Sequence, residues 1–71
     1  MPDITEALDH NRFREIQVRS VLVANLWLAL NLAAQRADAS DVRQKLEQII
    51  ELTRATNALV KTLGSKDVAN G

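Results

Sequence analysis

The sequence predicts an all-α protein, an antiparallel two-helix hairpin that pairs with a second copy into a dimeric four-helix bundle. Three observations predict this fold. The stretch VLVANLWLALNLAA, from Val21 to Ala34, is apolar on nearly every side. A conventionally amphipathic stretch follows from about Ser40 to Leu63, and a short polar turn joins the two. Helices joined by so short a connection are expected to lie antiparallel.

The composition points to oligomerisation as the source of stability. A chain of 71 residues forms at most one small domain. A single core of this size seldom supplies more than about 3–5 kcal/mol, so small domains usually also need disulfides, a metal ion or oligomerisation. Cys is absent, which excludes disulfides and thiolate metal sites, and a single His makes a zinc site implausible. Association with a second copy of the chain is therefore the source of added stability that remains possible for this composition.

The charge balance disfavours nucleic acid and membrane partners. Nine Lys and Arg balance nine Asp and Glu, and aromatic residues make up 3%, so neither bulk charge nor base stacking is available. Asp3, Glu6 and Asp9 are the opposite of a basic signal-peptide start. The stretch from Val21 to Ala34 is too short for a membrane span. We therefore expect a cytoplasmic protein with no membrane segment, metal or cofactor.

Residues 1–11 are predicted to be an acidic, partly helical segment. Asp3 and Glu6 have the spacing of a capping box, so a helical turn or two from Ile4 is expected. The polar residues from Asp9 to Asn11 predict a loose junction with the main helix.

The first main helix is predicted over residues 12–37, which contain no Gly or Pro. At about 1.5 Å per residue it is about 39 Å long. Because apolar residues occur on nearly every side, this helix needs cover beyond one neighbour. We assign a heptad-spaced stripe and adjoining residues to the dimer interface: Leu22, Leu26, Ala29, Ala33, Asn25, Leu28 and Leu32. The line of Val21, Leu28 and Leu32 has no certain partner.

The second helix is predicted over residues 40–63, with either Asp38 or Ser40 as its N-cap. Gly64 is placed to end it, and residues 64–71 are predicted to be a flexible tail. The two helices together supply the predicted hairpin core: Ile16, Val23, Trp27, Leu30, Leu46, Ile49, Leu52, Thr56, Leu59 and Leu63.

No residue pattern predicts catalysis. His10 beside Asp9 has no nucleophile near it in the sequence, and Glu47 with Glu51 reads as a solvated helix face. No Gly-rich phosphate loop, nucleophile elbow or Cys/His set occurs. The sequence therefore predicts a protein that is not an enzyme.

One basic and apolar cluster is the candidate partner-binding surface, and it consists of Arg12, Phe13, Arg14, Ile16 and Arg19. Arg and aromatic residues are favoured in protein interfaces. Contacts to nucleic acid phosphates and simple solvation are the alternatives that the pattern leaves open.

The second helical stretch, from Ser40 through Ile49 to Asn57, Val60 and Lys61, resembles the C-terminal helix of type III secretion needle subunits. The hairpin plan also resembles Rop-type RNA-binding hairpins. The turn lacks the Pro of the needle subunits, the first helix is more apolar than theirs, and the strong basic face of an RNA binder is absent. Such analogies of shape imply fold rather than function.

We therefore expect a protein–protein interaction module that homodimerises and binds another protein in order to inhibit, adapt or chaperone it. A structural or co-chaperone subunit of a helical assembly, such as a secretion apparatus, is the first alternative. A Rop-like nucleic-acid-binding bundle is the second.

Overall fold

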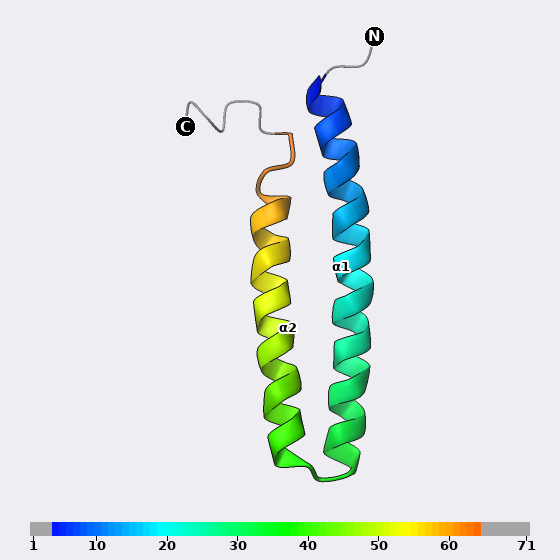
Figure 1. The fold of residues 1–71 in the computed structure, drawn as a ribbon, viewed down its shortest axis with the longest axis vertical. Coiled ribbons are helices and arrows are strands. Elements are labelled where there is room, and N and C mark those ends of the chain that lie inside the picture. Colours follow the sequence, from blue (N-terminus) through cyan, green and yellow to red (C-terminus); the bar gives the residue numbers. More distant parts are fainter. Residues whose placement is uncertain (1–3, 65–71) are drawn as a thin grey trace.

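The computed structural model is a hairpin of two long helices that lie side by side and run in opposite directions (Figure 1). Helix α1 spans Ile4–Gln35 and helix α2 spans Ala39–Val60. The structure describes residues 4–64, with side chains from residue 9 onward. The predicted all-α hairpin is confirmed. The first three residues of the acidic segment and residues 65–71 of the predicted tail lie outside the described residues.

Helix α1 is continuous through the polar stretch where a loose junction was predicted, so it begins at Ile4 rather than at Arg12. Residues 4–35 contain neither Gly nor Pro, and no residue in this range breaks the backbone hydrogen-bond ladder. The carboxylate of Asp9 bonds to Arg12 and to the end of α2 instead of competing for its own helix backbone.

The loop between the helices combines a helix end and a helix start in three residues. Ala37 has a left-handed backbone with φ of 56°, and its N–H donates to Ala34 O at 3.0 Å. Asp38 N–H donates to Ala33 O at 3.0 Å, which completes a Schellman motif. The Asp38 carboxylate then accepts from Asp41 N–H at 3.1 Å as the N-cap of α2. This tight loop sets the two helices antiparallel.

Asp41 anchors the loop electrostatically from the first turn of α2. Its carboxylate lies 2.8 Å from Lys45 Nζ and 3.0 Å from Arg36 Nη2. The hydrogen bond from Lys45, and then the charges of Lys45 and Arg36, lower the pKa of Asp41 despite some desolvation. Because the folded pKa is the lower one, this contribution to stability is present at neutral pH. It is lost as the pH falls through the folded pKa.

The hairpin buries little apolar surface. Among the described side chains only Ala33 and Ile49 are buried, with exposed fractions of 0% and 4%. The seam between the helices otherwise consists of half-buried residues such as Ile16, Leu26 and Leu59. Two helices form a single layer, and the Cα atoms extend 54 × 24 × 9 Å. Each helix therefore has only one neighbour to cover it.

Helix α1 is also long and apolar enough, by length and composition, to cross a membrane between Asp9 and Gln35. The most apolar 18-residue stretch of this segment has a mean hydropathy of 1.4, and 6% of it is buried in the hairpin. This apolar segment of α1 is thus longer than the run from Val21 to Ala34 that the sequence pattern indicates. The expectation of no membrane segment stays a prediction.

We predict that Ala37→Gly raises the free energy of unfolding by about 0.5–1 kcal/mol, because glycine adopts a positive φ without the clash that alanine suffers. Chemical denaturation followed by circular dichroism, at one fixed protein concentration, measures the change. The matched control is Ala24→Gly in the middle of α1, which should lower stability by about 1 kcal/mol. Equal losses in both variants would contradict the left-handed position of residue 37.

Candidate functional site

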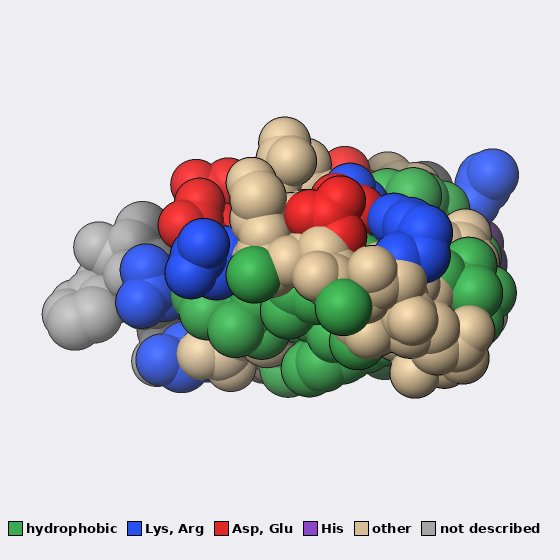
Figure 2. Space-filling model, turned by 90° about the horizontal axis from the view of Figure 1, so that it is seen from below, with side chains coloured by type: hydrophobic (Ala, Val, Ile, Leu, Met, Phe, Trp, Pro, Cys, Tyr) green, Lys and Arg blue, Asp and Glu red, His purple; other side chains and the backbone are tan. Residues whose placement is uncertain are grey.

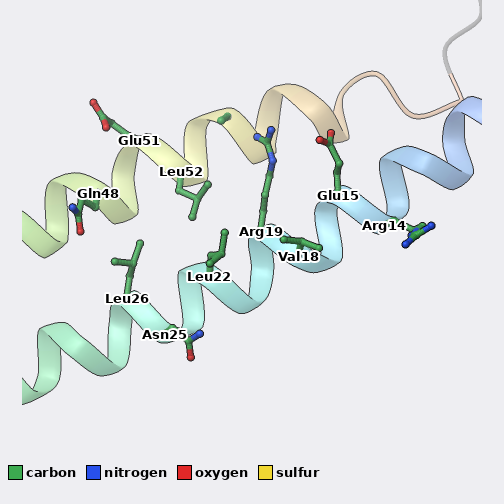
Figure 3. Close-up of a pocket in the computed structure, with 11 residues that line it drawn as sticks. Arg14, Glu15, Val18, Arg19, Leu22, Asn25, Leu26, Gln48, Glu51 and Leu52 are labelled. Atoms are coloured by element: carbon green, nitrogen blue, oxygen red, sulfur yellow. The ribbon is translucent and has the colours of Figure 1, made fainter.

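An open groove runs along one face of the hairpin between α1 and α2, with a volume of about 1080 Å³. Side chains from both helices line it, and Figure 3 draws them. They are Arg14, Glu15, Val18, Arg19, Leu22, Asn25, Leu26, Gln48, Glu51, Leu52 and Ala55. On each helix, single residues or adjacent pairs recur every three or four residues, which places them along one helical face.

The floor of the groove is apolar and its rim is charged. Leu22 and Leu26 point from α1 toward α2, and Leu52 points back toward α1 (Figure 3). Arg14 and Glu51 point away from the cleft, whereas Glu15 and Arg19 extend toward the α2 side. An apolar strip bordered by charged side chains is the usual anatomy of a protein-binding surface.

The structure divides the predicted basic cluster between different roles. Arg14 and Arg19 line the groove, whereas Ile16 is half-buried in the seam. Phe13 is exposed and does not line the groove. Arg12 is half-buried and donates from Nη1 to Thr62 O at 2.9 Å. Only part of the cluster therefore faces a common surface.

Arg12 and Asp9 form a polar clamp at the open end of the hairpin. Both carboxylate oxygens of Asp9 accept from Gly64 N–H at 3.1 Å, and Asp9 Oδ1 lies 3.3 Å from Arg12 Nη1. Gly64 has a φ of 69° and lies beyond the end of α2 at Val60. The sequence predicts only a loose junction at Asp9, because the partner of this residue lies 55 residues away in the chain.

The residues assigned to the dimer interface are split by the hairpin seam. Ala33 is buried, and Leu26 and Ala29 are half-buried within the single hairpin. The remaining members are exposed, and they are Leu22, Asn25, Leu28 and Leu32. A stripe that lies close to the direction of α2 is largely occupied by α2, so only its outer part is free for another chain.

The residues assigned to the hairpin core are also divided. Ile49 is buried, and most others are half-buried, namely Ile16, Val23, Leu30, Leu52, Thr56, Leu59 and Leu63. Trp27 and Leu46 instead have exposed fractions of 50% and 39%. The contact between two helices is narrow, and these two large side chains lie at its edge.

Charged side chains are unevenly distributed around the hairpin. Seen from the loop end, Asp and Glu gather along one side, while hydrophobic side chains lie in the centre and toward the opposite side (Figure 2).

A smaller hollow, about 350 Å³, is lined only by uncharged residues: Ser20, Val23, Thr53, Thr56, Asn57 and Val60. Sequence reasoning missed this hollow and also the contribution of Val18, Gln48 and Ala55 to the groove. Their spacing from Leu22 and Leu52 is the signal that places them there.

The described residues offer no constellation for metal chemistry, since no group of three or more His, Asp or Glu side chains lies close enough to hold an ion. No family model matches the chain, and neither a curated protein nor a solved structure shows significant similarity to it. The surfaces of the hairpin itself are therefore the guide to its function.

We predict that Arg12→Met opens the clamp while keeping an apolar stem in the seam. Loss of a charged hydrogen bond to Thr62 O weakens the end of the hairpin by about 0.5–1.5 kcal/mol, so the Gly64 amide should exchange roughly 2–10-fold faster. Hydrogen exchange measured by NMR tests this. Arg14→Met, two residues along and exposed on nearly the opposite side of the helix, should leave Gly64 unchanged, and a similar effect in both variants would contradict the clamp.

Proposed function

We propose that this protein is a small, non-enzymatic interaction module that homodimerises and binds a helix of another protein in order to inhibit, adapt or chaperone it. One observation carries the proposal: the single hairpin leaves most of its large apolar side chains uncovered. Val21 and Leu28 have exposed fractions of 59% and 58%, and Trp27, Phe13 and Leu22 are similarly open. A chain of this kind gains its missing core from other chains.

The burial of apolar side chains favours association. Covering one large apolar side chain is worth about 1.5–3 kcal/mol, so a few of them equal the stability that a core of this size supplies, about 3–5 kcal/mol. Large exposed apolar patches usually mark interaction sites. A second copy of the chain presents the same apolar surfaces and is present wherever the protein is made. We therefore propose that a homodimer covers part of the exposed apolar side chains.

The groove between α1 and α2 is the proposed site for the other protein. Leu22, Leu26 and Leu52 offer an apolar floor that fits the ridge of an amphipathic helix. Arg14 and Arg19 border the same floor and would favour acidic residues flanking that ridge. We also place the protein in the cytoplasm, where a dimer and its partner would meet in solution.

Insertion of α1 into a membrane is the competing function, because the apolar stretch from Asp9 to Gln35 favours it. The uncharged part of that stretch, from Ser20 to Gln35, is about 24 Å long at about 1.5 Å per residue. The hydrocarbon core of a bilayer is about 30 Å thick. The shortfall, together with Asn25 and Asn31 in the middle of the helix, leads us to favour protein partners.

We predict a helical dimer of twice the 7.9 kDa chain mass in analytical ultracentrifugation at micromolar concentration. Dilution should dissociate the dimer and lower its helicity together, because folding and association bury the same surface. A helical monomer at every concentration would contradict the proposal. Growth of mass without limit would support a structural polymer instead, and flotation with lipid vesicles would support membrane insertion.

The partner site is tested by photo-crosslinking from the groove. A benzophenone amino acid at Gln48, which lines the groove, should capture a distinct second protein in an extract of the native host. The same probe at Arg43, exposed on α2 and outside the groove, serves as the control. Capture of the same protein from both positions, or from neither, would reject the groove as the binding site.

A further inference from the structure

We propose that the two hairpins of the dimer pack antiparallel, with loops at opposite ends, through the uncharged face that contains Trp27, and that Trp27 of each copy fills the hollow beside Ser20 of the other. This inference rests on the homodimerisation proposed above. It adds the face, the direction and the anchoring residue of the contact.

The proposed face carries one heptad stripe from each helix. On α1 the stripe takes every third or fourth residue from Phe13 to Ala34, and on α2 it takes every fourth or third residue from Val42 to Leu63. Residues at this spacing lie along one side of a helix. Members of both stripes line the uncharged hollow together, so the two stripes face the same side of the hairpin.

Neither stripe contains a charged residue. The groove on the other face, in contrast, is bordered by Arg14, Glu15, Arg19 and Glu51. A two-fold contact brings identical surfaces together, so every charge near its centre meets a like charge. The uncharged face avoids that repulsion, which makes a second copy its fitting occupant. The charged rim of the groove suits a different partner.

The stripe on α1 is complementary in side-chain size to a second copy that is turned end for end about Val23. In this arrangement Trp27 lies opposite Ser20 of the other copy. The same operation sets Leu30 opposite Ile16 and Ala34 opposite Phe13. Each large side chain therefore meets a small one, and medium side chains meet each other.

The same operation about Thr53 matches side chains of medium size along α2. Leu46 falls opposite Val60 and Val42 opposite Leu63, while Thr56 falls at the level of Ile49, which is buried in the seam. Val23 and Thr53 line the same hollow, so the two centres lie at one level of the hairpin. A single two-fold axis across the hairpin at this level therefore satisfies both helices at once.

The parallel alternative lacks this complementarity. With the loops at the same end, α1 of one copy lies over α2 of the other at unchanged levels. Trp27 would then face the level of Ile49, and Phe13 that of Leu63, while the hollows beside Ser20 would face each other. Protein interiors are close-packed, and both overfilled and empty layers are destabilising. The antiparallel arrangement fills the hollow of about 350 Å³ with an indole ring.

Two hydroxyl groups in the hollow are also compatible with an apolar side chain placed over them. Ser20 Oγ donates to Gln17 O at 2.8 Å, and Thr56 Oγ1 donates to Leu52 O at 2.8 Å. Both hydroxyl donors are satisfied within their own helices, so an indole ring placed over them leaves neither of these two donors unpaired. The half-exposed indole of Trp27 on one copy thus has a complementary hollow on the other copy.

Exchange of the two residue sizes tests the fit. Ser20→Trp alone sets two indoles against each other, and Trp27→Ser alone leaves the hollow empty, so each should weaken the dimer at least about tenfold. The double variant S20W/W27S restores a large side chain opposite a small one and should recover dimerisation. Val21→Ser, exposed on the outer side of α1 and outside both the groove and the proposed contact, is the matched control and should leave the dimer constant within about twofold.

The direction is measured with nitroxide labels on Ser40→Cys in the otherwise Cys-free chain. Loops at opposite ends place the labels roughly 40 Å apart at about 1.5 Å per residue. Loops at the same end place them roughly 20 Å apart or less. A short distance, or no recovery in the double variant, overturns this inference while leaving the dimer intact. A monomeric wild type overturns the proposed function as well.

Discussion

The unequal apolar content of the two helices is the constraint on which the rest of this structure depends. Helix α1 carries large apolar side chains around its whole circumference, whereas α2 offers one apolar face to cover them. A two-helix layer covers each helix along one strip only, and in the described part of the chain that strip buries Ala33 and Ile49 alone. The uncovered remainder explains why the molecule is best understood as a component of a larger packed unit.

Polar contacts at the two ends hold the hairpin in register despite this thin core. At one end, Asp38 caps α2, and Asp41 binds Arg36 across the loop and Lys45 one turn along α2. At the other end, Asp9 and Arg12 bind the backbone of Thr62 and Gly64. Two buried side chains constrain the alignment of the helices only weakly, whereas these directional bonds fit one alignment only. They therefore fix which residues of α1 lie beside which residues of α2.

The register in turn divides the remaining surface into parts of different character. One face has an apolar floor and a charged rim, and the opposite face has an uncharged hollow beside Trp27. The outer side of α1, around Val21 and Leu28, is a third exposed apolar strip. In the proposed dimer the uncharged face is covered by the second copy, and the groove stays open for another protein. The outer strip is then the surface least accounted for by either contact.

The sequence by itself determined the all-α class, the two helices and the short polar turn between them, because these depend on local spacing and on the absence of Gly and Pro. Only the tertiary structure decided which side of α1 faces α2. A helix that is apolar on every side has no unique face, so its pattern cannot predict its rotation. For this reason Ala33 lies in the seam and Trp27 at its edge. The clamp at Asp9 likewise joins residues far apart in the chain, and no local pattern reports such a contact.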